Sequence, residues 1–436
     1  MKLRHLMLGA AAAFALSPAA ALAERGSDGQ LNIIYWQAPS TLNPYLSGGT
    51  KEVEAASLVL EPLAGFDNNG ELVPRLVDEI PTVENGGVSE DLTSITWVLS
   101  EGITWSDGSP VTANDAVFTW QYCTDPEGGC AQASYFDGVE SVEAVDDRTI
   151  RINFTAPKPF PYTALVGAES PLIQAAQFAD CLGAAAPECT EANFGPIGTG
   201  PFVVTEFRPN DVITYAANEN YRVPDQPAFA TVVFKGGGDA ASAARAVLET
   251  GEFDYAWNLQ IDPTILAEME ANGIGEVVTA FGTSVERLHL NQTNPDPALG
   301  DMRSTLEGGE HPFLTDPAVG QAMSMAIDRA LLVEIGYGAG GQATCNVLPA
   351  PELYASTAND DCLTQDLEGA AQVLEDAGWV DEDGDGVRER DGVRLSVLYQ
   401  TSTNAVRQDT QALVKQWWEE IGIEVELRNI DASVFF

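Results

Sequence analysis

Short apolar segments that suit strands alternate along the chain with amphipathic segments that suit helices. Residues 31–36 (LNIIYW) are an apolar run, and residues 148–154 (RTIRINF) alternate between apolar and polar side chains, as a half-buried strand does. Two further strands are predicted on either side of a turn at 208–210. Alternating strands and helices favour open α/β sheets, which bind ligands at the carboxyl ends of their strands.

Capping residues mark the predicted helix starts. Thr112 and Asp115 have the spacing of a capping box, and Asp316 can cap a helix whose first position is Pro317. The apolar side chains of this second segment fall on one helical face, at Val319, Met323, Ile327 and Leu331. One continuous helix is therefore predicted there. The later patterns predict a helix at 367–379, a strand at 393–400, a helix at 410–422 and a strand at 423–427.

The charge excludes one class of partner. The chain carries 65 acidic and 21 basic residues, which gives a formal net charge of −44. Such a surface repels phosphate backbones, so a nucleic-acid-binding role is excluded. The acids are spread through ordinary amphipathic segments and indicate a solvated surface.

The first residues predict export. Lys2 and Arg4 precede an apolar stretch that ends in small residues at position 23, so residues 1–23 are predicted to be a cleavable signal peptide and the mature protein to be periplasmic. An oxidising compartment favours disulfides. Six cysteines allow 15 pairings. Their spacing favours the nearest-neighbour pairs Cys123 with Cys130, Cys181 with Cys189 and Cys345 with Cys362.

The most conspicuous motif is the acidic stretch at 381–392 (DEDGDGVRERDG). Its aspartates alternate as calcium ligands do, at Asp381, Asp383 and Asp385. Position twelve is Gly392, where an EF-hand has a glutamate, so the stretch is not an EF-hand. Arg388 and Arg390 also stand where they could neutralise the aspartates. We expect a solvated turn and no cofactor, and a structural calcium site is the alternative.

Catalytic motifs are missing from the sequence. Beyond the signal peptide only His289 and His311 remain, and neither a Walker phosphate loop nor a GxSxG elbow occurs. Gly336, Gly338 and Gly341 match GxGxxG but follow a predicted helix, whereas the dinucleotide fingerprint must follow a strand. We expect no enzyme. A secreted hydrolase with paired carboxylates and a structural calcium is the competing hypothesis from another class.

Taken in order, several stretches resemble the family 5 extracellular solute-binding proteins of ABC importers, the peptide- and oligopeptide-binding group. They are STLNPY (40–45), LEPLAGFDNNGELVPRLVDE (60–79), TWVLSEGITWSDGSPVTANDAVFTW (96–120) and GTGPFVV (198–204). The order continues with DPAVGQAMSMAIDRALLVEIGYGAG (316–340), the Ala-Gly-Trp before the acidic stretch, and WWEEIGIEVEL (417–427).

This resemblance implies a periplasmic-binding-protein-like α/β fold of type II, with two lobes and an extra domain inserted in the first. Lobe one is expected at 24–66 and 198–286, the inserted domain at 67–197, and lobe two at 287–436. Family members run further than Phe436, and that part ordinarily carries the acidic residue that pairs with a peptide's amino terminus. We therefore expect that anchor to lie outside this chain.

The resemblance also implies a function and a site. The expected role is capture of a small solute, above all a di- or oligopeptide, by a monomer whose lobes close around it and which delivers it to an inner-membrane permease and ATPase complex. An oligosaccharide or an opine is the alternative ligand. The crossover that contains Asn291 and Gln292 is expected to be the hinge. Three loops that leave strands are expected to bind ligand: Trp36, Gln37, Ala38 and Pro39; Trp257, Asn258 and Gln260; and Tyr399, Thr401, Ser402, Thr403 and Asn404.

Each loop also has a purely structural interpretation. Trp36 and Trp257 could be core residues, and the Ser/Thr/Asn run could cap a helix. A binding pocket combines aromatic walls with a few placed polar groups, and these loops offer both.

Overall fold

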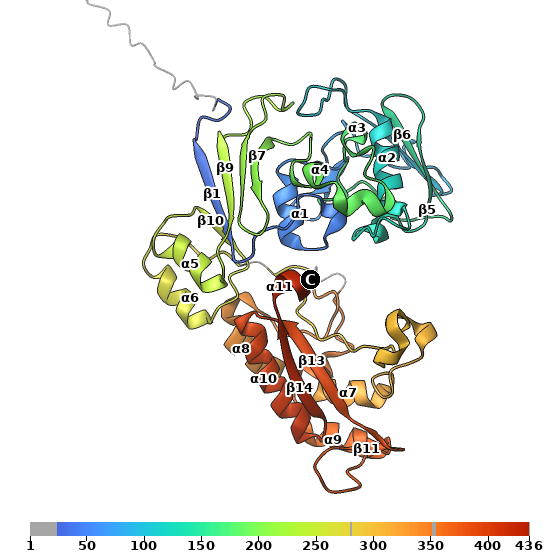
Figure 1. Ribbon diagram of the computed structural model, residues 1–436, viewed down its shortest axis with the longest axis vertical. Coiled ribbons are helices and arrows are strands. Elements are labelled where there is room, and N and C mark those ends of the chain that lie inside the picture. Colours follow the sequence, from blue (N-terminus) through green and yellow to red (C-terminus); the bar gives the residue numbers. More distant parts are fainter. Residues whose placement is uncertain (1–23, 280, 351–354, 436) are drawn as a thin grey trace, which may run out of the picture.

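A computed structural model describes residues 24–279, 281–350 and 355–435, so the predicted signal peptide lies outside the described residues. Two bodies follow one another along the longest axis (Figure 1). The first body holds residues 24–270 and the second body holds residues 291–435. They are joined by a stretch whose last part, 281–290, is called here the connecting segment and contains neither helix nor strand.

The first body is built on a five-stranded sheet with the order β10-β1-β9-β8-β7. β1 runs parallel to β9 and β10, whereas β8 is antiparallel to both β7 and β9. The strands are β1 (Gln30–Tyr35), β7 (Phe202–Arg208), β8 (Val212–Ala217), β9 (Thr231–Gly236) and β10 (Tyr255–Trp257). The structure confirms the predicted strands at 31–36, 198–207 and 211–217, and their ends differ from the predicted ends by at most four residues.

Helices flank this sheet. α1 (Thr50–Ser57) packs on it through Ala55, whose carbonyl oxygen accepts a hydrogen bond of 3.0 Å from the Tyr215 hydroxyl. α5 (Ala240–Leu248) and α6 (Pro263–Glu270) follow β9 and β10 and pack against each other around Leu248 and Met269. The core between α1 and the sheet consists of apolar side chains, among them Ile213, Tyr215, Val232 and Phe234.

A second core of the first body surrounds a three-stranded antiparallel sheet. It contains β4 (Ser94–Val98), β5 (Val139–Ala144) and β6 (Thr149–Phe154), with the small hairpin β2 (Ala64–Phe66) and β3 (Leu72–Pro74) beside it. The helices here are α2 (Ala113–Thr124), α3 (Ala175–Phe178) and α4 (Thr190–Phe194). α2 begins at the predicted capping box, because the Asp115 carboxylate accepts the Thr112 N–H at 2.8 Å. This core takes in Tyr45, Leu60 and Leu63 as well, which the expected division gives to lobe one.

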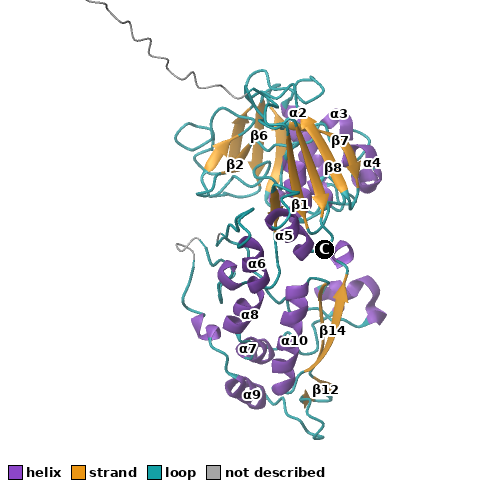
Figure 2. Ribbon diagram, turned by 90° about the vertical axis from the view of Figure 1, so that its left-hand side faces the viewer, coloured by secondary structure: helices purple, strands orange, loops and turns teal. Residues whose placement is uncertain are grey.

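The second body packs helices against a two-stranded parallel sheet. Its elements are α7 (Pro317–Met325), α8 (Arg329–Gly336), α9 (Leu367–Asp376), β11 (Glu389–Arg390), β12 (Val393–Arg394), β13 (Ser396–Ser402), α10 (Ala405–Glu420), β14 (Glu424–Ile430) and α11 (Ala432–Phe435). Figure 2 shows α7 to α10 gathered on one side of β14. Trp418 on α10 lies in this core and donates its indole N–H to the Met323 carbonyl at 3.0 Å.

The prediction of one continuous helix from Pro317 was wrong. The Asp328 carboxylate accepts the Leu331 N–H at 2.9 Å and so starts a new helix, α8. The Arg329 guanidinium donates to the Ser324 carbonyl at 3.0 Å and thereby satisfies the end of α7. An aspartate side chain can bond to nearby backbone N–H groups and start a new helix. The apolar face therefore runs on across the break, and the pattern alone did not reveal it.

The three predicted disulfides are confirmed as Cys123–Cys130, Cys181–Cys189 and Cys345–Cys362. The glycines of the GxGxxG match also lie as predicted. Gly336 is the last residue of α8, and a single 3₁₀ turn spans Gly338–Gly340. The motif thus ends a helix and does not open one after a strand.

Candidate functional site

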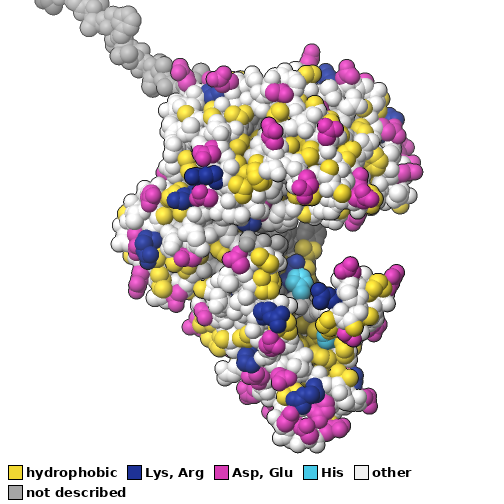
Figure 3. All heavy atoms as spheres, viewed as in Figure 1, with side chains coloured by type: hydrophobic (Ala, Val, Ile, Leu, Met, Phe, Trp, Pro, Cys, Tyr) yellow, Lys and Arg dark blue, Asp and Glu magenta, His cyan; other side chains and the backbone are white. Residues whose placement is uncertain are grey.

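The carboxyl ends of the parallel strands in the two bodies face each other. β1, β9 and β10 end toward the second body, and β13 and β14 end toward the first (Figures 1 and 2). The surface between the bodies is hollowed by a notch, and histidine and basic side chains gather on its wall (Figure 3). Loops that leave the carboxyl ends of strands are where open α/β sheets bind ligands.

The first predicted loop divides into two half-buried and two buried residues. Trp36 and Gln37 are half-buried, whereas Ala38 and Pro39 are buried. A methyl group added to Gly236 would lie 2.6 Å from the Ala38 side chain, so the glycine lets the β1 loop cross the end of β9. Ala38 and Pro39 therefore shape the loop, and Trp36 and Gln37 are its accessible members.

The second predicted loop follows β10. The Trp257 ring is half-buried, with its centroid 5.3 Å from that of Tyr35, and Tyr35 in turn packs on Phe234 at 4.5 Å. Trp257 thus belongs partly to the sheet core, as its structural interpretation supposes. Asn258 has a φ of 59°, a left-handed conformation that turns the chain sharply after the strand.

The third predicted loop meets the second one. Thr401, Ser402 and Asn404 are buried, while Thr403 is exposed. Asn404 caps α10, because its Oδ1 accepts the Arg407 N–H at 3.1 Å. Its Nδ2 also donates to Oε1 of Gln260 in the first body at 2.6 Å. The capping interpretation holds, and the same side chain bridges the two bodies.

A charged cluster beside this bridge was missed by the sequence reasoning. Arg407 donates to Glu286 through Nε at 3.1 Å and through Nη2 at 3.0 Å, and its Nη1 donates to the Ser402 hydroxyl at 3.2 Å. The Tyr337 hydroxyl donates to the same carboxylate at 3.3 Å. Burial raises the pKa of Tyr337 and of Tyr399 above the ordinary value, so both hydroxyls stay protonated. Arg407 precedes the helix predicted at 410–422 and belongs to α10 only in the structure, so the sequence pattern offered no signal for this cluster.

The predicted hinge residues start the second body. Asn291 accepts the Thr293 N–H at 3.1 Å, and the Gln292 carbonyl accepts the His311 N–H at 2.9 Å. Both side chains are exposed. Their role in a closing motion stays a prediction.

The acidic stretch forms a turn far from the facing strand ends. The Asp381 carboxylate accepts backbone N–H groups from Gly384 at 2.7 Å and Gly386 at 2.9 Å. Carboxylate oxygens of Asp381, Asp383 and Asp385 lie within 4.8 Å of one another. Backbone donors thus hold the turn in shape through Asp381, and the choice between a solvated turn without a cofactor and a calcium site stays a prediction.

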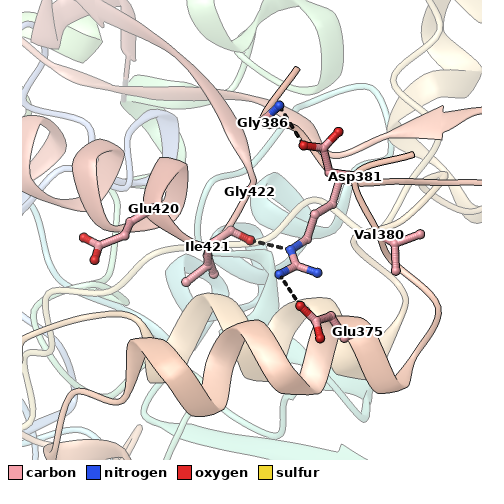
Figure 4. Close-up of a pocket in the computed structure, with 8 residues that line it drawn as sticks. Glu375, Val380, Asp381, Gly386, Glu420, Ile421 and Gly422 are labelled. Carbon is pink, nitrogen blue, oxygen red and sulfur yellow. Dashed lines mark hydrogen bonds and ion pairs between the residues drawn. The ribbon is translucent and has the colours of Figure 1, made fainter. Parts of the chain in front are cut away.

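The prediction that Arg388 and Arg390 could neutralise these aspartates was wrong. Arg388 donates to the Ile421 carbonyl at 2.9 Å and pairs with Glu375 at 3.1 Å, and a cavity of about 360 Å³ lies beside it (Figure 4). Arg390 pairs with Asp316 at 2.8 Å. The cation that pairs with the turn is Arg394, which lies 2.8 Å from Asp385. β11 and β12 pair in antiparallel fashion after the turn, and this pairing brings Arg394 of β12 back to Asp385.

Comparison with known families identifies the chain's relatives. Residues 71–436 match the bacterial extracellular solute-binding proteins, family 5 (Middle). Protein XP55 of Streptomyces lividans is 27% identical over 393 residues, covering 90% of this chain and 65% of that protein. The oligopeptide-binding protein AppA of Bacillus subtilis is 25% identical over 398 residues, covering 91% of this chain and 68% of that protein. The chain thus spans about two thirds of these relatives' length.

Solved structures show the same fold. Bacillus subtilis AppA in complex with a nonapeptide matches with a TM-score of 0.75 at 23% identity, over 94% of this chain and 76% of that one. NikZ of Campylobacter jejuni in complex with Ni(L-His) matches with a TM-score of 0.72 at 20% identity, over 94% and 75%. The expected periplasmic-binding-protein-like α/β fold is therefore confirmed. None of the helices in the described part of the chain is long and apolar enough to cross a membrane.

Proposed function

Since the chain belongs to the bacterial extracellular solute-binding proteins of family 5, we propose that it captures a peptide between its two bodies and delivers it to an ABC importer. The observation that carries this proposal is the contact between Gln260 and Asn404, which joins two predicted binding loops from opposite bodies. A ligand held between these loops touches both bodies at once. Such a ligand stabilises the closed arrangement, because it makes more contacts when the two bodies are close together than when they are apart.

The chemistry of the loops suits a peptide. Exposed Thr403 and half-buried Gln37 and Gln260 offer hydrogen bonds to peptide groups, and half-buried Trp36 offers an apolar wall. Hydrogen bonds to its peptide groups can hold a backbone whichever side chains it carries, as when an extended strand is added to a sheet edge. The AppA relatives are described as oligopeptide-binding and as bound to a nonapeptide, which agrees with this choice.

The other parts of the proposal concern the setting of the protein. The family is described as extracellular, and we place this member in the periplasm as a monomer that works with a permease and an ATPase in the inner membrane. We assign it no catalytic role. The three proposed ligand loops, the hinge at Asn291 and Gln292, and the division into two lobes with an inserted domain belong to the same proposal.

A thermal-shift screen tests the function. Tripeptides, pentapeptides and nonapeptides, oligosaccharides and opines are added separately, because a solute that binds only the folded protein raises the melting midpoint. A rise with peptides alone supports the proposal. Thr403→Ala should reduce that rise, and Thr155→Ala, an exposed threonine beside β6, is the matched control. A rise with sugars alone, with quenching of tryptophan fluorescence, would replace the peptide by an oligosaccharide.

A further inference from the structure

The cluster around Arg407 has the geometry of a carboxylate-binding site. Two nitrogens of one guanidinium hold the two oxygens of Glu286 at 3.1 and 3.0 Å, which is the fork arrangement that arginine forms with any carboxylate. The Tyr337 hydroxyl adds a third donor to the same group. Nothing in this arrangement requires the carboxylate to belong to the protein.

The arginine is held in place by its own body. Its backbone N–H is bonded to the side chain of Asn404, and its Nη1 is bonded to Ser402 at the carboxyl end of β13. The side chain of Arg407 is only 20% exposed. The guanidinium is therefore fixed beside the bridge from Asn404 to Gln260, at the edge of the proposed binding site.

Glu286, by contrast, is easily displaced. Its side chain is 44% exposed, and it lies on the connecting segment. Residues 282–290 form no backbone–backbone hydrogen bond with another described residue. The exposed side of Glu286 is open to water and to other carboxylates. Another carboxylate can therefore exchange with Glu286, because the guanidinium then keeps the same two fork contacts.

From these observations we propose that Arg407 binds a carboxylate of the ligand and that Glu286 is an internal competitor for the same position. The inference rests on the proposed function and names the class of ligand: a peptide with a free carboxylate, whether at its carboxyl terminus or on an acidic side chain. A local cation is needed for such a ligand, because a chain with a net charge of −44 otherwise repels anions. When the ligand takes Arg407, Glu286 and the connecting segment are released.

The test compares three forms of each probe by calorimetry: a glycine-serine peptide with a free carboxyl terminus, its carboxyl-terminal amide, and the amide with one internal glutamate. Tripeptide, pentapeptide and nonapeptide lengths are used. The free acid should bind at least about tenfold more tightly than the amide, as a charge-assisted bond to arginine provides. If the internal glutamate restores the affinity of the amide, a side-chain carboxylate can occupy Arg407 as well as the terminus; if it does not, only the terminus can.

Two variants separate ligand binding from structure. Arg407→Gln should bring the affinity for the free acid down to that for the amide. Glu286→Gln, which keeps the side-chain size, should tighten binding of the acid about threefold to tenfold and leave the amide unchanged. The exposed pair Arg245 and Glu249 on α5, 2.8 Å apart, provides the matched controls Arg245→Gln and Glu249→Gln.

The outcomes are distinct. A merely structural ion pair would lower the melting midpoint in both variants and leave the acid-to-amide ratio unchanged, which would overturn the inference. Equal binding of all three forms, the glutamate-containing amide included, by the natural protein would also overturn it while leaving peptide capture intact. If no peptide form binds at any length, the proposed function fails and this inference fails with it.

Discussion

A buried ion pair should hold the two cores of the first body together. Glu61 is 7% exposed and accepts three hydrogen bonds, from Arg222 Nη1 at 2.5 Å, from Arg222 Nη2 at 3.0 Å and from the Thr199 hydroxyl at 3.0 Å. Arg222 also donates to the Arg75 carbonyl at 2.7 Å. The pair thus joins the chain before the β2–β3 hairpin to the chain that follows β8.

Arg222→Met is the informative perturbation. It leaves the buried Glu61 carboxylate with the Thr199 hydroxyl as its single remaining donor among those bonds. Removing one partner of a buried pair costs about 3–5 kcal/mol. Because the Arg222 side chain is 25% exposed, we expect a loss near the lower limit, about 3 kcal/mol, in the free energy of unfolding.

Urea unfolding followed by circular dichroism measures this loss. The double variant Glu61→Gln with Arg222→Met should recover part of it, because the buried charge is then gone. Arg245→Met, in an exposed pair, should change the free energy by less than about 1 kcal/mol. A loss below about 1 kcal/mol in Arg222→Met, or a double variant no better than the single one, would refute the reasoning.

Three further outcomes are expected. Burial alone would raise the pKa of Asp316, but the Trp379 hydrogen bond and an arginine hold this pKa below its ordinary value. The Asp316 carboxylate therefore stabilises the folded protein fully above about pH 4, and this contribution is lost as the pH falls through the folded pKa. Asp316→Asn should be less stable than the natural protein near neutral pH and should approach it in acid-denaturation curves. Replacing Cys345 and Cys362 by alanine opens a loop with a sequence separation of 17 and should cost about 3 kcal/mol, and an unchanged urea midpoint would contradict this. Calcium and EDTA should give melting midpoints within about 1 °C of each other, and a calcium-specific rise abolished by Asp381→Asn would show that the turn binds a metal.

The order of elements could be predicted from local patterns. The strand at 31–36, the helix after Thr112 and the helix that ends before Gly422 follow from periodicity and capping, which depend on residues a few positions apart. The cysteine pairs were predictable for the same reason, because the partners are close in the sequence. The helix break at Asp328 was missed because an apolar face continued across it.

The sequence alone did not determine the arrangement of the site. It indicated which loops leave strands, because apolar runs followed by turn formers mark the carboxyl ends of strands. It could not show that Asn404 meets Gln260, 144 positions away, or that Arg407 holds Glu286, 121 positions away. Such pairs form only when the packing of two hydrophobic cores sets the distance between side chains. Periodicity therefore determined the elements, and tertiary packing decided which charges meet and where a ligand can be held.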